Sequence, residues 1–457
     1  MQYSQAFFVV NIFFRGKLNP VYRLLLKSVN MAAGYRIKTV KLESGERLPL
    51  LLSNETGLPL WGPTLFILTK LRATNLAVNT IQQAARAVLV AHQIFSYLHI
   101  DLNERMLKGR LLSLGEIEAL VKFAALRQEE LNSLLEEQAN DEKNYQVASF
   151  KKRAARKQSK TPKMVSSETK TIRLLYIRDY ISHLITGRIL QLDVNHKYYE
   201  ALNQAAQIIT TGINARIPEK SYESSIRMGV GPEIKARILE VIQPDNPENP
   251  WESKHVRARN QLIFLWLINL GLRNGELLSV YAQDVNLRSR EVTIVRRPDN
   301  PEEVRSNAPM VKTKGRLILM DAELSDLTKA YLMSFRSKYK GARRHPYLFV
   351  ATGTGLPLSK SALNKLFREL RDKVPELPDD LSPHVLRHTW NDDFSVLMDE
   401  RGVAPEQEEI MRRQMMGWSD KSNMAATYTK RHVQRKANQA SLAMQKKIFA
   451  SIKKKTS

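Results

Sequence analysis

Apolar residues recur every three to four positions along most of this chain, the spacing that places them on one face of a helix. In the first half this pattern covers residues 81–98, 117–134, 172–181 and about 196–213. In the second half it covers residues 230–243, 254–271, 321–338, 359–373, 384–399, 405–416 and 422–446. Ser113 and Glu116 form a capping box ahead of residue 117. The pattern predicts a mainly α-helical protein.

Three segments depart from the helical spacing and are typical of strands. Residues 35–52 alternate loosely between apolar and polar positions around Gly45, which predicts a small hairpin. Residues 291–296 and 311–319 are short apolar segments joined by a loop rich in Pro, Asn and Asp. We therefore expect a small antiparallel β-sheet in the second half of the chain.

A break near residues 215–228 separates the two halves of the chain. We expect an N-terminal extension over 1–60 with the hairpin, a helical domain over 61–218, a second domain over 225–448 and a basic tail over 449–457. The sequence that begins at Met31 is more typical of a protein N-terminus than the sequence that begins at Met1. Residues 1–30 are therefore interpreted as an appended element or as the result of a start codon assigned too early.

The charge of the chain points to its partner. Lys and Arg number 71 against 46 Asp and Glu, a formal net charge of +25. Because so many positive charges repel one another in the folded state, the excess favours a polyanionic partner. Nucleic acid is the first candidate and an anionic membrane surface is the second. A merely basic globular protein is the alternative. No apolar run approaches the roughly 20 residues of a membrane-spanning helix, so we expect no membrane contact.

Two further composition features narrow the chemistry. The chain has no cysteine, which excludes disulfides, cysteine-ligated zinc and a cysteine nucleophile, and which fits a cytoplasmic location. Residues 150–163 hold seven basic side chains and no acidic one, so they form either a solvated loop or a loop laid along phosphates. The candidates for DNA contacts there are Lys151, Lys152, Arg153, Arg156, Lys157 and Lys160.

The first motif with chemical content is Gly271-Leu-Arg273-Asn-Gly-Glu276-Leu, at the end of a strongly apolar helix. Gly271 ends that helix, so the Arg273 guanidinium can leave the apolar body of the protein. Glu276, three residues on, can hold that guanidinium in place. A surface salt bridge is the alternative interpretation of this pair.

The second motif is Pro383-His384-Val-Leu-Arg387-His388-Thr389. His384 and Arg387 are three apart in a helix and project from one face, where both can donate to the oxygens of one phosphate. His388 is interpreted as a helix residue packed under the site.

The last motifs are Met416-Gly417-Trp418-Ser419 and Ala425-Ala-Thr-Tyr428, with ten residues from Trp418 to Tyr428. The indole of Trp418 can donate a hydrogen bond to phosphate but cannot titrate. Core packing is the alternative for Trp418, as it is for any single tyrosine. Lys312 and Lys314, between the first two motifs, both fall on the second predicted strand and share a face, so alternation cannot separate them.

In this order, over about 155 residues, the motifs resemble those of the tyrosine-recombinase (phage-integrase) family. The resemblance implies catalytic roles for Arg273, Lys312, His384, Arg387, Trp418 and Tyr428, with Glu276 and His388 as supporting residues. Lys312 is preferred over Lys314 because Lys-Thr-x-x-basic before an apolar strand matches some integrases best. Trp418 stands where many members have His, and its distance in sequence to Tyr428 is one residue longer than usual.

The resemblance also implies the reaction and the partners. We expect site-specific cleavage and rejoining of double-stranded DNA through a 3′-phosphotyrosyl intermediate, in integration or excision of a mobile element, without metal or other cofactor. The fold implied is a two-lobed DNA clamp, mainly α with a small antiparallel sheet in the C-terminal catalytic domain. We expect a homo-tetramer on two DNA sites, a monomer or dimer when free, and association with the bacterial nucleoid. Accessory recombinases are further candidate partners.

Three points stay open at this stage. A type IB topoisomerase uses a related Arg-Lys-Arg-His-Tyr site, and a catalytically silent DNA-binding protein could share the scaffold. Residues 430–457, which hold nine Lys or Arg and no acid, either dock on a neighbouring subunit or touch DNA. The recognised DNA sequence is not readable from one chain, because a few side chains make the base contacts.

Overall fold

The computed structural model describes residues 34–74, 76–145, 162–218, 228–305 and 308–456. The chain divides into two compact units, Met1–Glu223 and Ser224–Ser457, which are described separately. The predicted DNA contacts Lys151, Lys152, Arg153, Arg156, Lys157 and Lys160 lie outside the described residues.

The first unit opens with the expected hairpin. Strands β1 (Tyr35–Lys41) and β2 (Arg47–Ser53) pair antiparallel, with Tyr35 opposite Ser53 and Lys41 opposite Arg47. The leucines of β2 are buried in a cluster with Phe66 and with apolar residues of the long helix that follows. The hairpin is therefore packed against the helices and does not stand alone.

The helices of the first unit are α2 (Trp61–Phe66), α3 (Val78–Tyr97), α4 (Leu102–Leu107), α5 (Leu114–Ala124), α6 (Gln128–Tyr145), α7 (Ser167–Ile189) and α8 (Tyr199–Asn214). A π-helical turn, Ile67–Arg72, follows α2. The predicted capping box is present at the start of α5, where Ser113 and Glu116 bond each other's backbone N–H groups. Helices α3, α5, α7 and α8 enclose one continuous apolar core.

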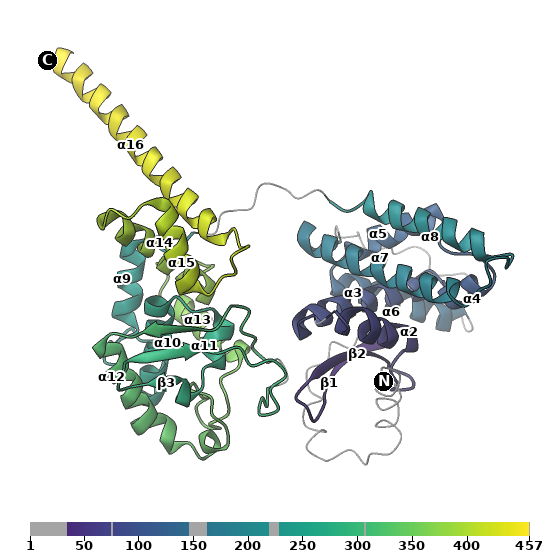
Figure 1. Ribbon diagram of the computed structural model, residues 1–457, viewed down its shortest axis with the longest axis horizontal. Coiled ribbons are helices and arrows are strands. Elements are labelled where there is room, and N and C mark those ends of the chain that lie inside the picture. Colours follow the sequence, from purple (N-terminus) through teal and green to yellow (C-terminus); the bar gives the residue numbers. More distant parts are fainter. Residues whose placement is uncertain (1–33, 75, 146–161, 219–227, 306–307, 457) are drawn as a thin grey trace. The chain divides into compact units, whose positions relative to one another are not determined.

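The second unit is built from helices around a small sheet (Figure 1). Its helices are α9 (Pro232–Val241), α10 (Lys254–Leu270), α11 (Asn274–Ser279), α12 (Ala322–Ala330), α13 (Lys360–Lys373), α14 (Pro383–Glu400), α15 (Pro405–Met416) and α16 (Met424–Thr456). The strands β3 (Val285–Asn286), β4 (Glu291–Ile294) and β5 (Arg316–Leu319) form an antiparallel sheet in that order. Helix α10 is buried at the centre of the core, with Trp266 fully enclosed. The predicted fold class, mainly α with a small antiparallel sheet, is confirmed.

Strand β5 is shorter than predicted, and this corrects the position of the two lysines. The strand begins at Arg316, opposite Ile294, so Lys312 and Lys314 precede it and lie on no strand. The backbone N–H of Lys314 donates to the Gly417 carbonyl, 2.9 Å away, instead of to β4. The argument that alternation puts both lysines on one strand face is therefore wrong.

Helix α16 continues past the predicted end at residue 446 as far as Thr456. It leaves the body of the second unit as a single helix, the yellow segment of Figure 1. Residues 436–448 are exposed without interruption. Within the described ranges, no helix is both long enough and apolar enough to cross a membrane.

Candidate active site

The turn between α10 and α11 places Arg273. Gly271 ends α10 with a φ of 57°, in the left-handed region. A Cβ at this position would lie 2.8 Å from the Trp390 ring, so both the backbone and the packing require glycine. Arg273 then stands at the N-cap of α11 with its side chain 28% exposed, which leaves the guanidinium open to a ligand.

Glu276 lies at the centre of a buried cluster of cations. Its carboxylate contacts Arg273 at 3.3 Å, as expected, but its shorter bonds are to the Thr313 hydroxyl at 2.7 Å and to Arg316 at 2.8 Å. Burial alone would raise the pKa of Glu276, but Arg316, Arg387 and the Thr313 hydroxyl outweigh burial and lower it to about 2. The carboxylate is therefore ionised and balances several guanidinium groups.

Arg316 is a site residue that the sequence analysis missed. It lies on the first residue of β5 with its side chain 6% exposed, and it bonds both Glu276 and the Thr313 hydroxyl. A Cβ on Gly417 would lie 2.9 Å from the Arg316 guanidinium, so the turn after α15 packs against it. The available signal was the basic residue four positions after Lys312, which the Lys-Thr-x-x-basic pattern contains.

Arg387 is the second guanidinium of the site and is buried within α14. It donates to the Gly271 carbonyl at 2.6 Å and to the Met416 carbonyl at 3.4 Å, and it lies 3.7 Å from the Glu276 carboxylate. Burial and the charge of Arg273 lower the pKa of Arg387 to about 9, so the group is still cationic at neutral pH. Its bonds tie the turn after α10 to the turn after α15.

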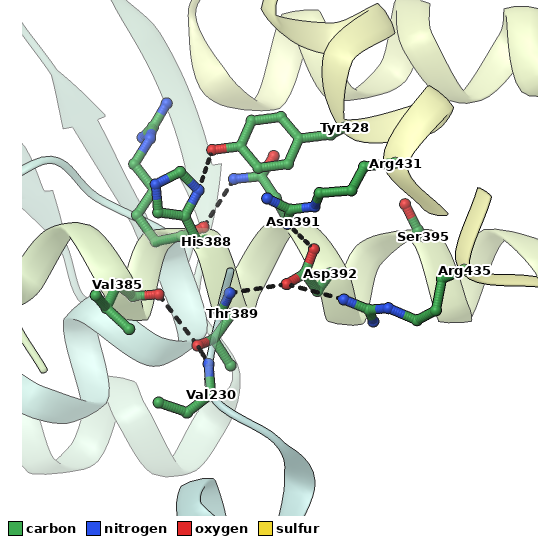
Figure 2. Close-up of polar contacts among 12 residues, drawn as sticks. Val230, Val385, His388, Thr389, Asn391, Asp392, Ser395, Tyr428, Arg431 and Arg435 are labelled. Carbon is green, nitrogen blue, oxygen red and sulfur yellow. Dashed lines mark hydrogen bonds and ion pairs between the residues drawn. The ribbon is translucent and has the colours of Figure 1, made fainter. Parts of the chain in front are cut away.

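Tyr428, near the start of α16, is buried between an indole and an imidazole. Its ring stacks on Trp418, with 5.8 Å between the ring centroids and 9° between the planes. Its hydroxyl lies 2.7 Å from Nδ1 of His388. A dashed line in Figure 2 marks this contact. Burial raises the pKa of the Tyr428 phenol, while Arg387 and Arg431 oppose that shift. The phenol is therefore protonated at neutral pH.

His388 and His384 lie one turn apart on α14. His388 is buried, as expected of a packed residue, but it also contacts the Tyr428 hydroxyl, which the sequence analysis did not foresee. His384 is exposed and lies on the first turn of the helix, which Ser382 caps. The two ring centroids are 4.4 Å apart. Both imidazoles therefore border the same hydroxyl region from one helix.

The two candidate lysines differ in their surroundings. Lys314 is 59% exposed and pairs with Asp420 at 3.0 Å. Lys312 is exposed and forms no hydrogen bond or ion pair with any described residue. Thr313, between them, bonds Glu276, so the segment is fixed beside the cluster of guanidinium groups.

Contacts connect all the predicted site residues other than the lysines. The Arg387 guanidinium lies 5.6 Å from the Trp418 ring, and this indole Nε1 is buried without an acceptor among the described residues. The sequence of contacts runs through Arg273, Glu276, Arg387, Trp418, Tyr428, His388 and His384. Residues from four separate segments of the chain thus meet in one place.

Known proteins resemble this half of the chain. Residues 241–435 match the phage integrase family. Tyrosine recombinase XerA of Saccharolobus solfataricus is 29% identical over 147 residues, which are 32% of this chain and 39% of that protein. The TnP I resolvase of Bacillus thuringiensis is 26% identical over 223 residues, 46% of this chain and 66% of the resolvase.

Solved structures give weaker likenesses over more of the chain. The Tn1549 transposon integrase in complex with transposon right end DNA is 14% identical, with a TM-score of 0.45 over 84% of this chain and all of that one. A crystal structure of XerA recombinase is 16% identical, with a TM-score of 0.33 over 82% of this chain and 96% of that chain. The matches in sequence span less than two thirds of each curated relative. Residues 241–435, the segment that carries Arg273, His384, Arg387, Trp418 and Tyr428, thus match the phage integrase family.

Proposed function

We propose that this protein cleaves and rejoins double-stranded DNA at specific sites, with Tyr428 as the nucleophile. The observation that carries the proposal is the convergence of Arg273, Arg387, Trp418 and Tyr428 in one connected cluster. Arg273 lies more than a hundred positions before the other three residues in the sequence. A merely structural tyrosine would not need two guanidinium groups around it.

The chemistry needs cationic donors around a phosphate. Attack by the phenol oxygen passes through a five-coordinate state with extra negative charge on the equatorial oxygens. The planar guanidinium groups of Arg273 and Arg387 match those oxygens. Trp418 supports this assignment, because its buried Nε1–H has no acceptor among the described residues and a phosphate oxygen would supply one.

Lys312 is the better candidate to protonate the departing 5′ oxygen. Its ammonium group is exposed and makes no ion pair within the described ranges, whereas Lys314 is engaged with Asp420. Thr313 fixes the segment beside Glu276, which would bring Lys312 to the edge of the phosphate site. The product of the first step would be a 3′-phosphotyrosyl bond and a free 5′-hydroxyl.

The finer proposal is integration or excision of a mobile element by a tetramer on two DNA sites. Support comes from α16, which exposes Val433, Leu442 and Met444, at 51%, 55% and 65%. An isolated helix with exposed apolar side chains gains stability by docking on a neighbouring subunit. We infer that the DNA itself is gripped by basic surfaces, residues 151–160 among them, in a two-lobed clamp.

A nicked suicide duplex tests this proposal. The probe is a pool of random-sequence duplexes, each nicked at a central position, so that the cleaved end diffuses away and traps the adduct. Wild-type protein should yield a covalent protein–DNA adduct that resists SDS, and Tyr428→Phe should yield none. Tyr331→Phe, another buried tyrosine of the same unit, is the control that should retain the adduct. An adduct formed by Tyr428→Phe would show that the nucleophile is a different residue.

A further inference from the structure

The hydrogen bond between Tyr428 and His388 has a chemical meaning beyond packing. The phenol oxygen and His388 Nδ1 are 2.7 Å apart, and both side chains are buried. The other ring nitrogen, Nε2, is buried without a hydrogen-bond partner in the described part of the chain. The ring therefore has one polar contact of short range, and that contact is with the nucleophile's oxygen.

The geometry points to His388 as the group that accepts the Tyr428 proton during attack on DNA. We propose this role for His388 and not for His384, the histidine three residues before Arg387. His384 is exposed on the first turn of α14, where it is suited to donate to a phosphate oxygen. The inference rests on the proposed function, since it concerns the same nucleophile.

Burial and the neighbouring cations keep the His388 ring neutral, against the opposing charge of Asp392. His384, Arg387 and Asp392 face it from α14, and Arg431 faces it from α16. Burial, with the charges of His384 and Arg431, lowers the pKa of His388 to about 4. Only a neutral imidazole has a free lone pair for a proton, so the resting ring is in the form that a proton acceptor requires.

The proton moves only as the new bond forms. Burial separates the pKa of the phenol from that of the imidazole, so the proton stays on Tyr428 in the resting protein. When the phenol oxygen bonds to phosphorus, its proton passes to Nδ1 of His388. The bond from phosphorus to the 5′ oxygen breaks, and that oxygen keeps the electron pair and takes a proton from Lys312. Rejoining reverses both transfers, so the enzyme ends as it began.

Asp392 holds the tyrosine helix in the position that this transfer needs. Its carboxylate pairs with Arg431 on α16, at a position three residues after Tyr428, and accepts the backbone N–H of Gly229 at 3.0 Å. The Arg431 guanidinium lies 5.0 Å from the centre of the Tyr428 ring. Figure 2 shows His388 at the Tyr428 hydroxyl and Arg431 beside Asp392. Helices α14 and α16 are thus fastened next to the reacting pair.

His388→Gln separates proton transfer from positioning. Glutamine can accept a hydrogen bond from the phenol but cannot take its proton. On nicked duplexes enriched from the random pool, we expect adduct formation to slow by about 100-fold or more. This is the rate loss usually seen when one general acid or base is removed. The remaining rate should rise with pH, because hydroxide then removes the proton. A rate within a few-fold of wild type, or a pH profile unchanged by the substitution, would overturn the proposal.

A second substrate distinguishes a defect in proton removal from the nucleophile from a defect in proton donation to the leaving group. A 5′-bridging phosphorothiolate releases a thiolate, which needs no proton from Lys312. This substrate should restore the rate of Lys312→Ala but not that of His388→Gln, since the missing step of the latter is at the nucleophile. Restoration of His388→Gln would place its role at the leaving group and contradict the inference.

Two controls complete the test. His432→Gln changes a histidine on α16 that bonds Asp399 and not Tyr428, and it should leave the rate near wild type. Thermal unfolding of each variant checks the fold. If wild-type protein forms no adduct at all, the proposed function fails; if wild type and His388→Gln form it equally fast, only the role of His388 fails.

Discussion

Glu276 and Arg316 form a buried ion pair, 2.8 Å between carboxylate and guanidinium, at the point where α11 meets β5. Because the carboxylate also neutralises Arg387 and contacts Arg273, its loss leaves buried positive charge without a counter-charge. We expect Glu276→Gln to lower the free energy of unfolding by about 3 kcal/mol, as for breaking one partner of a buried pair. Urea unfolding measures this change, with the exposed Glu323→Gln as a control that should be near neutral.

The same carboxylate makes stability depend on pH in a defined direction. The pKa of Glu276 is lowered from 4.5 to about 2 in the folded protein, so its contribution is present above pH 4.5 and is lost as the pH falls toward 2. Wild-type protein should therefore lose more stability than Glu276→Gln over that interval. Parallel curves for the two proteins would show that Glu276 is not held ionised.

Asp392→Asn tests whether the fastening of α14 to α16 controls the nucleophile. The substitution weakens the pairing with Arg431, so the Tyr428 hydroxyl should occupy its reactive position less often. We expect adduct formation to fall by about tenfold, with DNA binding unchanged, because misplacement of a reacting group is costly. Asp393→Asn is the matched control, since that neighbour pairs with Lys235 and not with Arg431. Equal rates for the two variants would argue against the positioning role.

Trp418→Phe separates the indole's packing from its hydrogen bond. Phenylalanine can keep the stacking on Tyr428 but lacks the Nε1–H that we expect to donate to phosphate. Loss of one transition-state donor should slow cleavage by about 100-fold, while the melting temperature changes little. Trp251→Phe removes an indole N–H that bonds Glu369, outside the site, and should cleave at the wild-type rate. A Trp418→Phe enzyme with full activity would assign the residue to packing alone.

The two lysines give opposite expectations. Lys312→Ala should slow cleavage of a normal substrate by about 100-fold or more, because the 5′ oxygen then leaves without a proton. Lys314→Ala removes only an exposed pairing with Asp420 and should cleave at close to the wild-type rate. Single-turnover cleavage rates distinguish the two outcomes. The reverse order of effects would make Lys314 the general acid.

Local rules in the sequence predicted where most helices lie, although residues 117–134 divide between α5 and α6 and α12 ends at Ala330. The rules failed where tertiary contacts decide. The capping box at Ser113 and the helix end at Gly271 follow from residue type and spacing, and both are present. The start of β5 does not follow from residue type and spacing. It depends on the bond of Thr313 to Glu276, 37 positions away, and on the bond of the Lys314 backbone to Gly417, 103 positions away. A pattern of neighbouring residues cannot show such pairings.

The same limit applies to the candidate site. Motif order brought out Arg273, His384, Arg387, Trp418 and Tyr428, whose roles remain predictions. Arg316 and the contact of His388 escaped notice, because a basic residue before a strand and a histidine inside a helix are ordinary in isolation. Their significance comes from burial against Glu276 and against the Tyr428 hydroxyl.

The most direct test of the central claim is to identify the residue that carries DNA after cleavage. Wild-type adduct from the nicked pool would be digested with trypsin and nuclease, and the modified peptide sequenced by mass spectrometry. The account predicts a nucleotide joined through its 3′ phosphate to Tyr428. A nucleotide on any other residue, or one joined through a 5′ phosphate, would contradict it.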